Sequence, residues 1–356
     1  MSTRVTIQDI ADALGISRNT VSKAINNTGV LSDATRDKVL KKAMEMGYKQ
    51  FSYVTITDTD KVGLSISTPK ENNEIALFTT TFLGSSHFSS TMLDKFHREL
   101  SQLGYSLTMH RILPDDLATL KLPSSFIKER TAGIVCVEMF DFKYSKMLCS
   151  LDIPVLFIDS PVTILDEPLE ADRLYMDNRS NIYLFVKEMA RRKKTRIGFI
   201  GEHMHCQSFY ERYMGYRDAM YMLGLPCPDE YCIIKNKEGV RNPSSSDYRE
   251  YLTECIQKLE ELPDVFICAN DFVALDTMQV LRKLGYSIPQ DVCLCGFDDS
   301  PESKVVTPSL TTIHIHSQIM GFSAVHLLIS RIKEPSLNYR TVHTETTLIY
   351  RESTEG

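Results

Sequence analysis

The sequence predicts an α/β protein with an N-terminal three-helix helix-turn-helix domain and a two-lobed body of parallel sheets flanked by helices. Three observations support this prediction. The first fifty residues hold three short amphipathic helical patterns. From Lys61 onward, short apolar runs alternate with amphipathic stretches, which is typical of parallel sheets covered by helices. About 290 residues of this alternation are too many for one comfortable sheet, so two lobes are expected.

The N-terminal domain has the pattern of a helix-turn-helix followed by a third helix. Thr6 can cap the first helix, whose apolar residues share the spacing i, i+3, i+4 and i+7 and form one buried stripe: Ile7, Ile10, Ala11 and Leu14. Gly15 permits the tight turn that follows. Ser17 can cap a second helix over about 18–25, and Ser32 can cap a third. Two short helices joined by a glycine turn form a helix-turn-helix.

The start of the second helix carries residue types that bind DNA. Arg18 can pair with guanine and Asn19 with adenine, and Lys23 lies one turn further on the same side. Short hydroxyls suited to phosphate contacts stand near them: Thr6, Ser17, Thr20 and Ser22. A helix that reads the major groove fits this pattern. An ordinary helical domain with a solvated polar face fits the helix pattern as well.

The charge distribution favours a nucleic-acid partner at one end only. Residues 1–50 hold eight Lys and Arg against five Asp and Glu, a net charge of +3. The whole chain carries −6, so the remainder carries −9. A small basic domain on an acidic body suits a protein that touches phosphate with one end.

Composition indicates a protein that stays in the cytoplasm. No apolar run approaches the roughly 18–20 residues that span a bilayer. The start MSTRVTIQDIADAL lacks the apolar segment of an export signal. The nine cysteines include no Cys-x-x-Cys, and several lie in apolar runs, so buried and reduced thiols are expected.

No metal site, cofactor site or enzyme activity is expected. His203 with His205, and His314 with His316, could each chelate from one face of a strand, but spacing fixes no third ligand beside them. The sequence has neither a phosphate-binding P-loop nor the GxGxxG of a dinucleotide site.

The N-terminal domain resembles the DNA-binding domain of the LacI/GalR repressor family over the whole of TIQDIADALGISRNTVSKAINNTGVLSDATRDKVLKKAMEMGY. The specific parts are IADALGIS and TVSKAIN. The resemblance implies that the two residues after Ser17, and the basic residue four beyond the second, read the operator. These are Arg18, Asn19 and Lys23, in a DNA-contacting stretch that runs to Asn26.

Residues 49–60 are the expected linker between the DNA-binding domain and the body. In the family this segment forms a hinge helix that wedges a leucine into the minor groove. Here Thr57 falls at the leucine position, and the β-branched residues before it disfavour a helix. Either Ile56 or Val54 is the wedge, or this chain has no wedge and bends DNA differently.

The body is expected to hold strands with helices between them. The expected strands are KVGLSIS, YSLTMH, AGIVCV, PVLFID, RIGFIG, DVFICA and DVCLCGF. The expected helices include 91–103, 179–191, 208–223, 247–260 and 271–284. The expected domains are the helix-turn-helix at 1–48, the linker at 49–60 and the effector-binding and dimerisation domain at 61–356. Its first lobe takes about 61–160 and 302–330, and its second about 161–301 and 331–356.

The family resemblance continues through the body and is most specific in PDVFICANDFVALDTMQVLRKLGYSIPQDVCLCGFDDSPESKVVTPSLTTI. Ligands of such folds bind at the carboxyl ends of the strands. The resemblance implies an effector site made by Asp159, Arg212, Asn270 and Asp298, with Ser208 and Phe88 as weaker additions. Alternatives stay open: Asn270 could cap the following helix, Asp298 could be a turn residue, and Arg212 could form a surface salt bridge.

The resemblance therefore implies a homodimeric regulator, a repressor, that binds a pseudo-palindromic operator in double-stranded DNA under the control of a small polar effector. A sugar or sugar derivative is the expected effector. Arg241 and Asn242 stand where sugar-binding members carry an acid and an aromatic platform, so the effector could be another polar molecule. A solute-binding receptor of transport type is the alternative, and it predicts an export signal and no DNA-binding domain.

Overall fold

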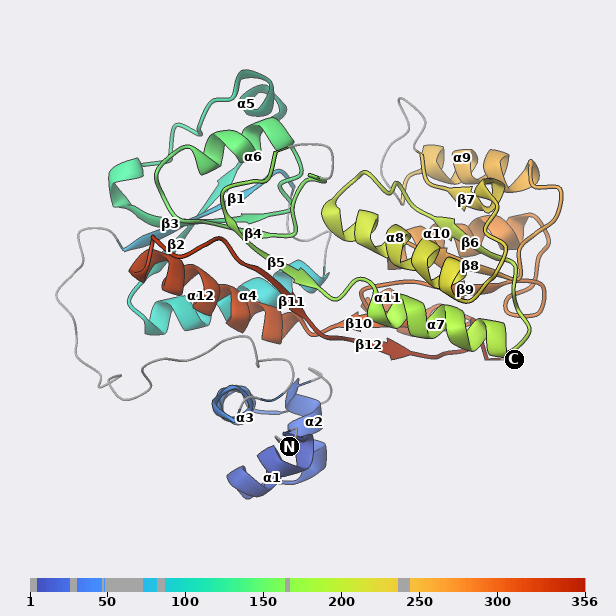
Figure 1. Cartoon of the computed structure of the whole chain (residues 1–356), viewed down its shortest axis with the longest axis horizontal. Helices are drawn as coiled ribbons and strands as arrows, with labels where there is room; N and C mark the ends of the chain where they lie inside the picture. Colours follow the sequence, from blue (N-terminus) through green and yellow to red (C-terminus); the bar gives the residue numbers. More distant parts are fainter. Residues whose placement is uncertain are drawn as a thin grey trace. The chain divides into compact units, whose positions relative to one another are not determined.

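The computed structural model describes residues 5–25, 31–46, 48, 73–81, 87–163, 167–235 and 244–355, without the side chains of Asp33, Met44, His87 and Phe88. The chain divides into two compact units (Figure 1). Unit 1 comprises Met1–Tyr175 and His316–Glu345, and unit 2 comprises Met176–Ile315 and Thr346–Gly356. None of the helices in these described ranges is long and apolar enough to cross a membrane.

The N-terminal part of unit 1 contains three helices: α1 (Ile7–Leu14), α2 (Arg18–Ile25) and α3 (Asp33–Glu45). Gly15 ends α1 in the left-handed conformation, with φ of 64°, which a glycine adopts without strain. The apolar faces of the three helices share one core made by Ile10, Ala11, Val21, Ala24, Ile25, Val39, Leu40 and Ala43. The expected helix-turn-helix followed by a third helix is confirmed.

The rest of unit 1 is built on a six-stranded sheet with the order β11-β5-β4-β3-β1-β2. Its strands are β1 (Glu74–Thr79), β2 (Ser106–Arg111), β3 (Thr131–Val137), β4 (Val155–Ile158), β5 (Asp172–Met176) and β11 (Thr341–Thr344). The pairs β1–β2, β1–β3, β3–β4 and β4–β5 are parallel. The helices α5 (Pro114–Thr119) and α6 (Phe142–Cys149) lie on one side of this sheet, and α4 (His87–Gln102) and α12 (Ser317–Lys333) on the other (Figure 1).

Unit 2 is built on a four-stranded parallel sheet with the order β7-β6-β8-β9. Its strands are β6 (Ile197–Ile200), β7 (Cys232–Ile233), β8 (Val265–Cys268) and β9 (Cys293–Cys295). A separate antiparallel pair, β10 (Thr312–Ile315) with β12 (Thr346–Ile349), is joined to β9 and the segment after it by the bridges Cys295–Thr311 and Asp298–His314. The helices are α7 (Ser180–Arg191), α8 (Gln207–Met222), α9 (Ser246–Gln257), α10 (Asp271–Lys283) and α11 (Pro301–Val305). Residues of α9 and α10 share a core with alternate residues of the sheet, and Phe199 packs against Tyr213 and Tyr216 of α8.

Two expectations about the body need adjustment. The strand β1 was not among the expected strands, and the expected KVGLSIS lies outside the described residues. The lobe boundaries also differ, because residues 161–175 and 331–345 group with unit 1 and residues 302–315 with unit 2. The reason for the first shift is that β5 and β11 extend the sheet of unit 1 beyond β4.

A buried ion cluster fixes the late part of the chain in unit 1. The Asp172 carboxylate, fully buried at the start of β5, accepts hydrogen bonds from Arg331 at 3.0 Å and from Arg340 at 2.8 Å. Burial opposes ionisation of Asp172, but the hydrogen bonds from both guanidinium groups outweigh it and lower its pKa. These bonds join Asp172 to two arginines that lie about 160 residues further along the chain.

Candidate DNA interface and effector site

The first helix of the N-terminal three-helix domain, called the head from here on, is stabilised by a capping box. The backbone N–H of Thr6 donates to Asp9 Oδ2 at 2.7 Å, and Asp9 N donates back to Thr6 Oγ1 at 3.3 Å. The Thr6 hydroxyl also donates to Asp9 Oδ2 at 2.7 Å, and this bond, together with the bond from the Thr6 backbone N–H, lowers the pKa of Asp9. Thr6 is therefore a structural cap whether or not it also touches phosphate.

The second helix presents its expected DNA-reading residues to solvent. Arg18 and Asn19 are exposed at its N-terminus, and Lys23 is partly exposed one turn later. The opposite face buries Val21 and Ala24 in the core of the head. The face of α2 that would read bases is therefore not packed against the core of the head.

The hydroxyl residues of α2 also serve the helix itself. Ser17 Oγ accepts the N–H of Thr20 at 3.0 Å, which is an N-cap, and the two hydroxyls are 2.8 Å apart. Ser22 is partly exposed. The other two expected DNA contacts, Asn26 and Ile56, lie outside the described residues.

Arg212 organises a polar cluster in unit 2. Its side chain is only 3% exposed. The guanidinium donates to the carbonyl of Ala269 at 2.6 Å and to Asn178 Oδ1 at 3.0 Å, and lies 3.5 Å from the centre of the Phe297 ring. Asp298 Oδ1 is 3.7 Å from the same guanidinium. The alternative of a surface salt bridge is therefore wrong, because the cation is buried and held by fixed partners.

The cluster continues along α8 and back to the end of β5. Asn178 donates to Glu211 Oε2 at 2.9 Å and to Ser208 Oγ at 3.4 Å. Ser208, Glu211 and Arg212 share one face of α8, since their spacing is three to four residues. A buried arginine, carboxylate, amide and hydroxyl together can recognise a ligand rich in hydrogen-bonding groups.

The two remaining unit 2 candidates sit at the carboxyl ends of neighbouring strands. Asn270 lies just after β8 and caps α10, because its side-chain oxygen accepts the N–H of Val273 at 3.0 Å. The alternative that Asn270 is a helix cap therefore holds for that oxygen. Asp298, after β9, has φ of 113°, a strained conformation for a residue with a side chain. Strain of this kind is common at ligand sites, and Asp298 remains a candidate.

The residue after Asp298 belongs to a structural ion cluster. Asp299 is buried and binds His314 Nδ1 at 2.9 Å, Lys304 Nζ at 3.1 Å, and Arg351. Burial opposes its ionisation, but the hydrogen bonds from His314 and Arg351 prevail and lower its pKa. His314 is engaged with this carboxylate. No group of three or more metal-ligating side chains occurs in the described part of the chain.

Unit 1 places two carboxylates after neighbouring parallel strands. Asp159 follows β4 and Glu138 follows β3, and both have positive φ, 60° and 55°. Asp159 Oδ1 accepts the N–H of Ser160 at 2.8 Å, and Glu138 Oε1 accepts the hydroxyl of Ser89 at 2.9 Å. The side chain of Phe88 lies outside what the structure describes.

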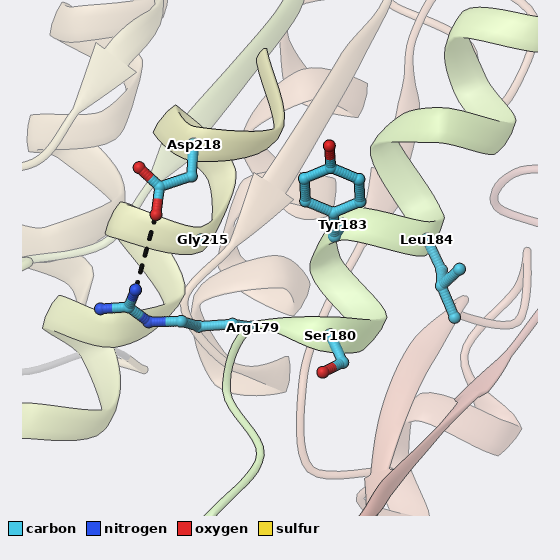
Figure 2. A pocket seen from close by; sticks show the side chains of 6 residues that line it. All are labelled: Arg179, Ser180, Tyr183, Leu184, Gly215 and Asp218. Carbon is cyan, nitrogen blue, oxygen red and sulfur yellow. Dashed lines mark hydrogen bonds and ion pairs between the residues drawn. The ribbon is translucent and has the colours of Figure 1, made fainter. Parts of the chain in front are cut away.

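A separate hollow of about 480 Å³ lies on unit 2 between α7 and α8. Figure 2 shows Arg179 reaching toward Asp218 at one side of it, with an Nη1–Oδ2 distance of 3.5 Å. None of the expected effector residues lines this hollow. For this reason the hollow is not our candidate effector site. Both charged partners of the ion pair are about half exposed, so the pair contributes little to stability.

Four partners of these clusters were not singled out from the sequence: Asn178, Glu211, Phe297 and Glu138. Each of the first three touches Arg212 or its direct partner. Position offered a signal for Glu138, because it follows the expected strand AGIVCV, whereas Asn178 follows β5, which the sequence did not predict. Glu211 and Phe297 offered none, since an acidic residue on a helix and a phenylalanine after a strand are ordinary.

Two stretches of the chain match known families. Residues 6–50 match bacterial regulatory proteins of the lacI family, and residues 186–354 match the periplasmic binding protein-like domain. Full-length relatives include HTH-type transcriptional repressor PurR of Vibrio vulnificus (strain CMCP6), 25% identical over 98% of both chains. PurR of Haemophilus influenzae (strain PittEE) is 26% identical over 99% of both.

Solved structures share the fold. A complex of the transcriptional regulator CelR with cellobiose has a TM-score of 0.68 and 21% identity, covering 98% of this chain and 100% of that one. The lac repressor dimer bound to operator and the anti-inducer ONPF has a TM-score of 0.65 and 18% identity, covering 99% and 100%. The expected fold class is confirmed. The chain thus combines a DNA-binding domain of the lacI family of bacterial regulatory proteins with a periplasmic binding protein-like domain, and it is similar over its full length to transcriptional repressors.

Proposed function

We propose that this protein is a sequence-specific repressor that binds operator DNA as a homodimer and releases or tightens its grip when a small polar effector binds its body. The observation that carries the DNA-binding part is the exposure of Arg18 and Asn19 at the start of α2, with the core of the head on the opposite face. Both side chains can make bidentate contacts with base edges.

The effector part rests on the polar cluster around Arg212. Burying an arginine, an amide and a carboxylate is costly unless they are hydrogen-bonded, and here they are mostly bonded to one another. A ligand with several hydroxyl groups can exchange some of these bonds for its own. We therefore propose a sugar or sugar derivative as the effector, bound by Arg212, Ser208, Asn178, Glu211 and Asp298, with Asn270 and Asp159 as further candidates.

DNA binding is tested by selecting duplexes from a random pool with the purified full chain and measuring their affinity by fluorescence anisotropy. We expect one pseudo-palindromic sequence to be enriched. Its affinity should fall steeply as salt rises, because phosphate contacts release counterions. Recovery of no enriched sequence at low salt would refute the proposal.

The effector is tested by thermal-shift screening of sugars, sugar phosphates and nucleobases, since a ligand of the folded state raises the melting temperature. A hit must also change operator affinity. Arg212→Ala should abolish the shift, whereas Arg179→Ala, in the separate hollow between α7 and α8, should retain it. Loss of the shift in Arg179→Ala alone would move the effector site to that hollow.

A further inference from the structure

Two cysteines of unit 2 converge on one phenol oxygen. Tyr216 of α8 is fully buried and donates its hydroxyl to the carbonyl of Ile197 at 2.7 Å. The same oxygen accepts the thiol of Cys227 at 3.2 Å and the thiol of Cys232 at 3.8 Å. The two sulfur atoms are therefore at most about 7 Å apart.

The segment that joins the two thiols is short and lies at the edge of the sheet. Cys227 precedes a 3-10 turn, Asp229–Tyr231, and Cys232 begins β7, the edge strand next to β6. Both cysteines are partly exposed, whereas Cys136, Cys268 and Cys295 are buried. A small oxidant can reach this pair while those three thiols are enclosed.

The electrostatic surroundings distinguish the two thiols. The neighbouring Cys232 thiol lowers the pKa of Cys227, with smaller contributions from Tyr216 and Arg217. The Cys227 thiol, together with burial, raises the pKa of Cys232. Arg217 is held in place by Asp229 at 2.7 Å and by the hydroxyl of Tyr213 at 3.0 Å. Cys227 is thus the more nucleophilic member, and Cys232 stands ready to resolve its oxidised form.

We propose that Cys227 and Cys232 form a redox-sensitive dithiol that hydrogen peroxide oxidises to an intramolecular disulfide and that thiol reductants restore. The Cys227 thiolate attacks the peroxide, the O–O bond breaks, and a sulfenic acid forms as hydroxide leaves. The Cys232 sulfur then attacks the Cys227 sulfur, the S–O bond breaks, and hydroxide leaves as water with the Cys232 proton. Two thiols and one peroxide give one disulfide and two waters.

Oxidation would change the environment of α8. The disulfide removes both thiol hydrogen bonds from Tyr216, which lies one turn after Arg212 on that helix. An effect on effector binding follows from this placement and rests on the proposed function. The dithiol chemistry itself does not depend on it.

The test is a mass measurement on the full chain. The protein is exposed to a graded dose of hydrogen peroxide, the remaining thiols are alkylated with iodoacetamide, and trypsin is added. The tryptic peptide 218–235 contains Cys227 and Cys232 and no other cysteine, and the peptide 250–258 contains only Cys255, which is also partly exposed. We expect 218–235 to lose the mass of two hydrogens and take no alkyl group, at a dose that leaves Cys255 alkylated. Dithiothreitol should restore both alkylation sites.

Two variants test the assigned order. Cys232→Ser should stop at a sulfenic acid on Cys227 that dimedone traps, and Cys227→Ser should leave Cys232 alkylated at the same dose. Full alkylation of both cysteines in the wild type at doses that oxidise Cys255 would overturn the proposal. Because the measurement needs no DNA and no effector, its failure is distinct from failure of the proposed function.

Discussion

Individual residues carry the DNA-reading hypothesis and can be tested one at a time. Arg18→Ala or Asn19→Ala should relax base preference at one position of each half-site. Each good bidentate contact is worth about 1–3 kcal/mol of discrimination, so the preferred base should lose that much advantage. The measurement is a comparison of affinities for duplexes that differ at single positions. Lys143→Ala is the matched control, because it removes an exposed positive charge on α6, outside the head. An unchanged base preference in both head variants would show that α2 does not read the bases.

Asp271 gives the molecule a pH dependence of unusual sign. Burial raises the pKa of this carboxyl to about 6 from an ordinary 3.8, against hydrogen bonds from Thr312 at 2.6 Å and Ser300 at 2.7 Å. Between these two values the folded state holds a proton that the unfolded state has released. The stability that Asp271 contributes is therefore full below its ordinary pKa and is lost as pH rises through its folded pKa.

The corresponding prediction compares wild type with Asp271→Asn. The difference in unfolding free energy, wild type minus variant, should fall by about 2 kcal/mol as pH rises from about 4 to about 7, which follows from the size of the shift. Urea titrations at several pH values measure it. A carboxyl with a lowered pKa that does not interact with Asp271, such as Asp172, affects both chains alike and cancels. A difference that rises with pH would contradict the assignment.

Elements were predicted well where local signals sufficed. The caps and glycine turn of the head placed α1 and α2 within a residue of their observed bounds. The strands β5, β11 and β12 were not expected, since DRLYM begins with two charges and the late strands depend on distant partners. Asp172 forms ion pairs with arginines about 160 residues away, and no local sequence pattern predicts such a contact. The effector cluster was found in part for the same reason: Asn270 and Asp298 follow expected strands and were singled out, whereas Asn178 follows the unexpected β5, and Glu211 and Phe297 had no local signal.

The turn between α1 and α2 tests one such local signal. Gly15→Ala should destabilise the head by about 1 kcal/mol, because φ of 64° costs an L side chain that much while no atom lies within 4 Å of a new Cβ. Gly15→Asn should cost less, since Asn tolerates this conformation. Hydrogen exchange of the amides of α1 and α2 measures the change. Equal protection in Gly15→Ala and wild type would show that the backbone there relaxes freely.

The ion cluster of Asp172 tests a long-range contact between elements. Asp172→Asn should destabilise unit 1 by about 3–5 kcal/mol, because it leaves the buried Arg331 without its counter-charge. Denaturant unfolding measures the loss. Glu167→Gln is the control. It breaks an ion pair with Lys146 whose two side chains are mostly exposed, and it should cause no measurable change in the free energy of unfolding. If the two substitutions changed the free energy of unfolding by similar amounts, the Asp172 cluster would not stabilise unit 1.

At the scale of the whole molecule, the small size of the reading surface supports the proposed homodimer. An eight-residue α2 brings only a few side chains to base edges, too few to select one site in a genome. A two-fold dimer doubles the contacts and fixes the distance between half-sites. The acidic body, with a net charge of −9 against +3 for the first fifty residues, adds no general attraction to DNA, so affinity has to come from the two heads together.

The proposed homodimer predicts how the full chain responds to changes in the selected operator. Scrambling one half-site should lower affinity at least about 100-fold, because each mismatched base pair costs about 1–3 kcal/mol and several are lost. Inserting about five base pairs between intact half-sites should be as harmful, since it turns one half-site to the opposite side of the duplex. Scrambling bases outside both half-sites is the control and should leave affinity unchanged. Fluorescence anisotropy at fixed salt measures all three. If a single half-site bound as tightly as the pair, the heads would act independently, and the dimeric mechanism would be wrong.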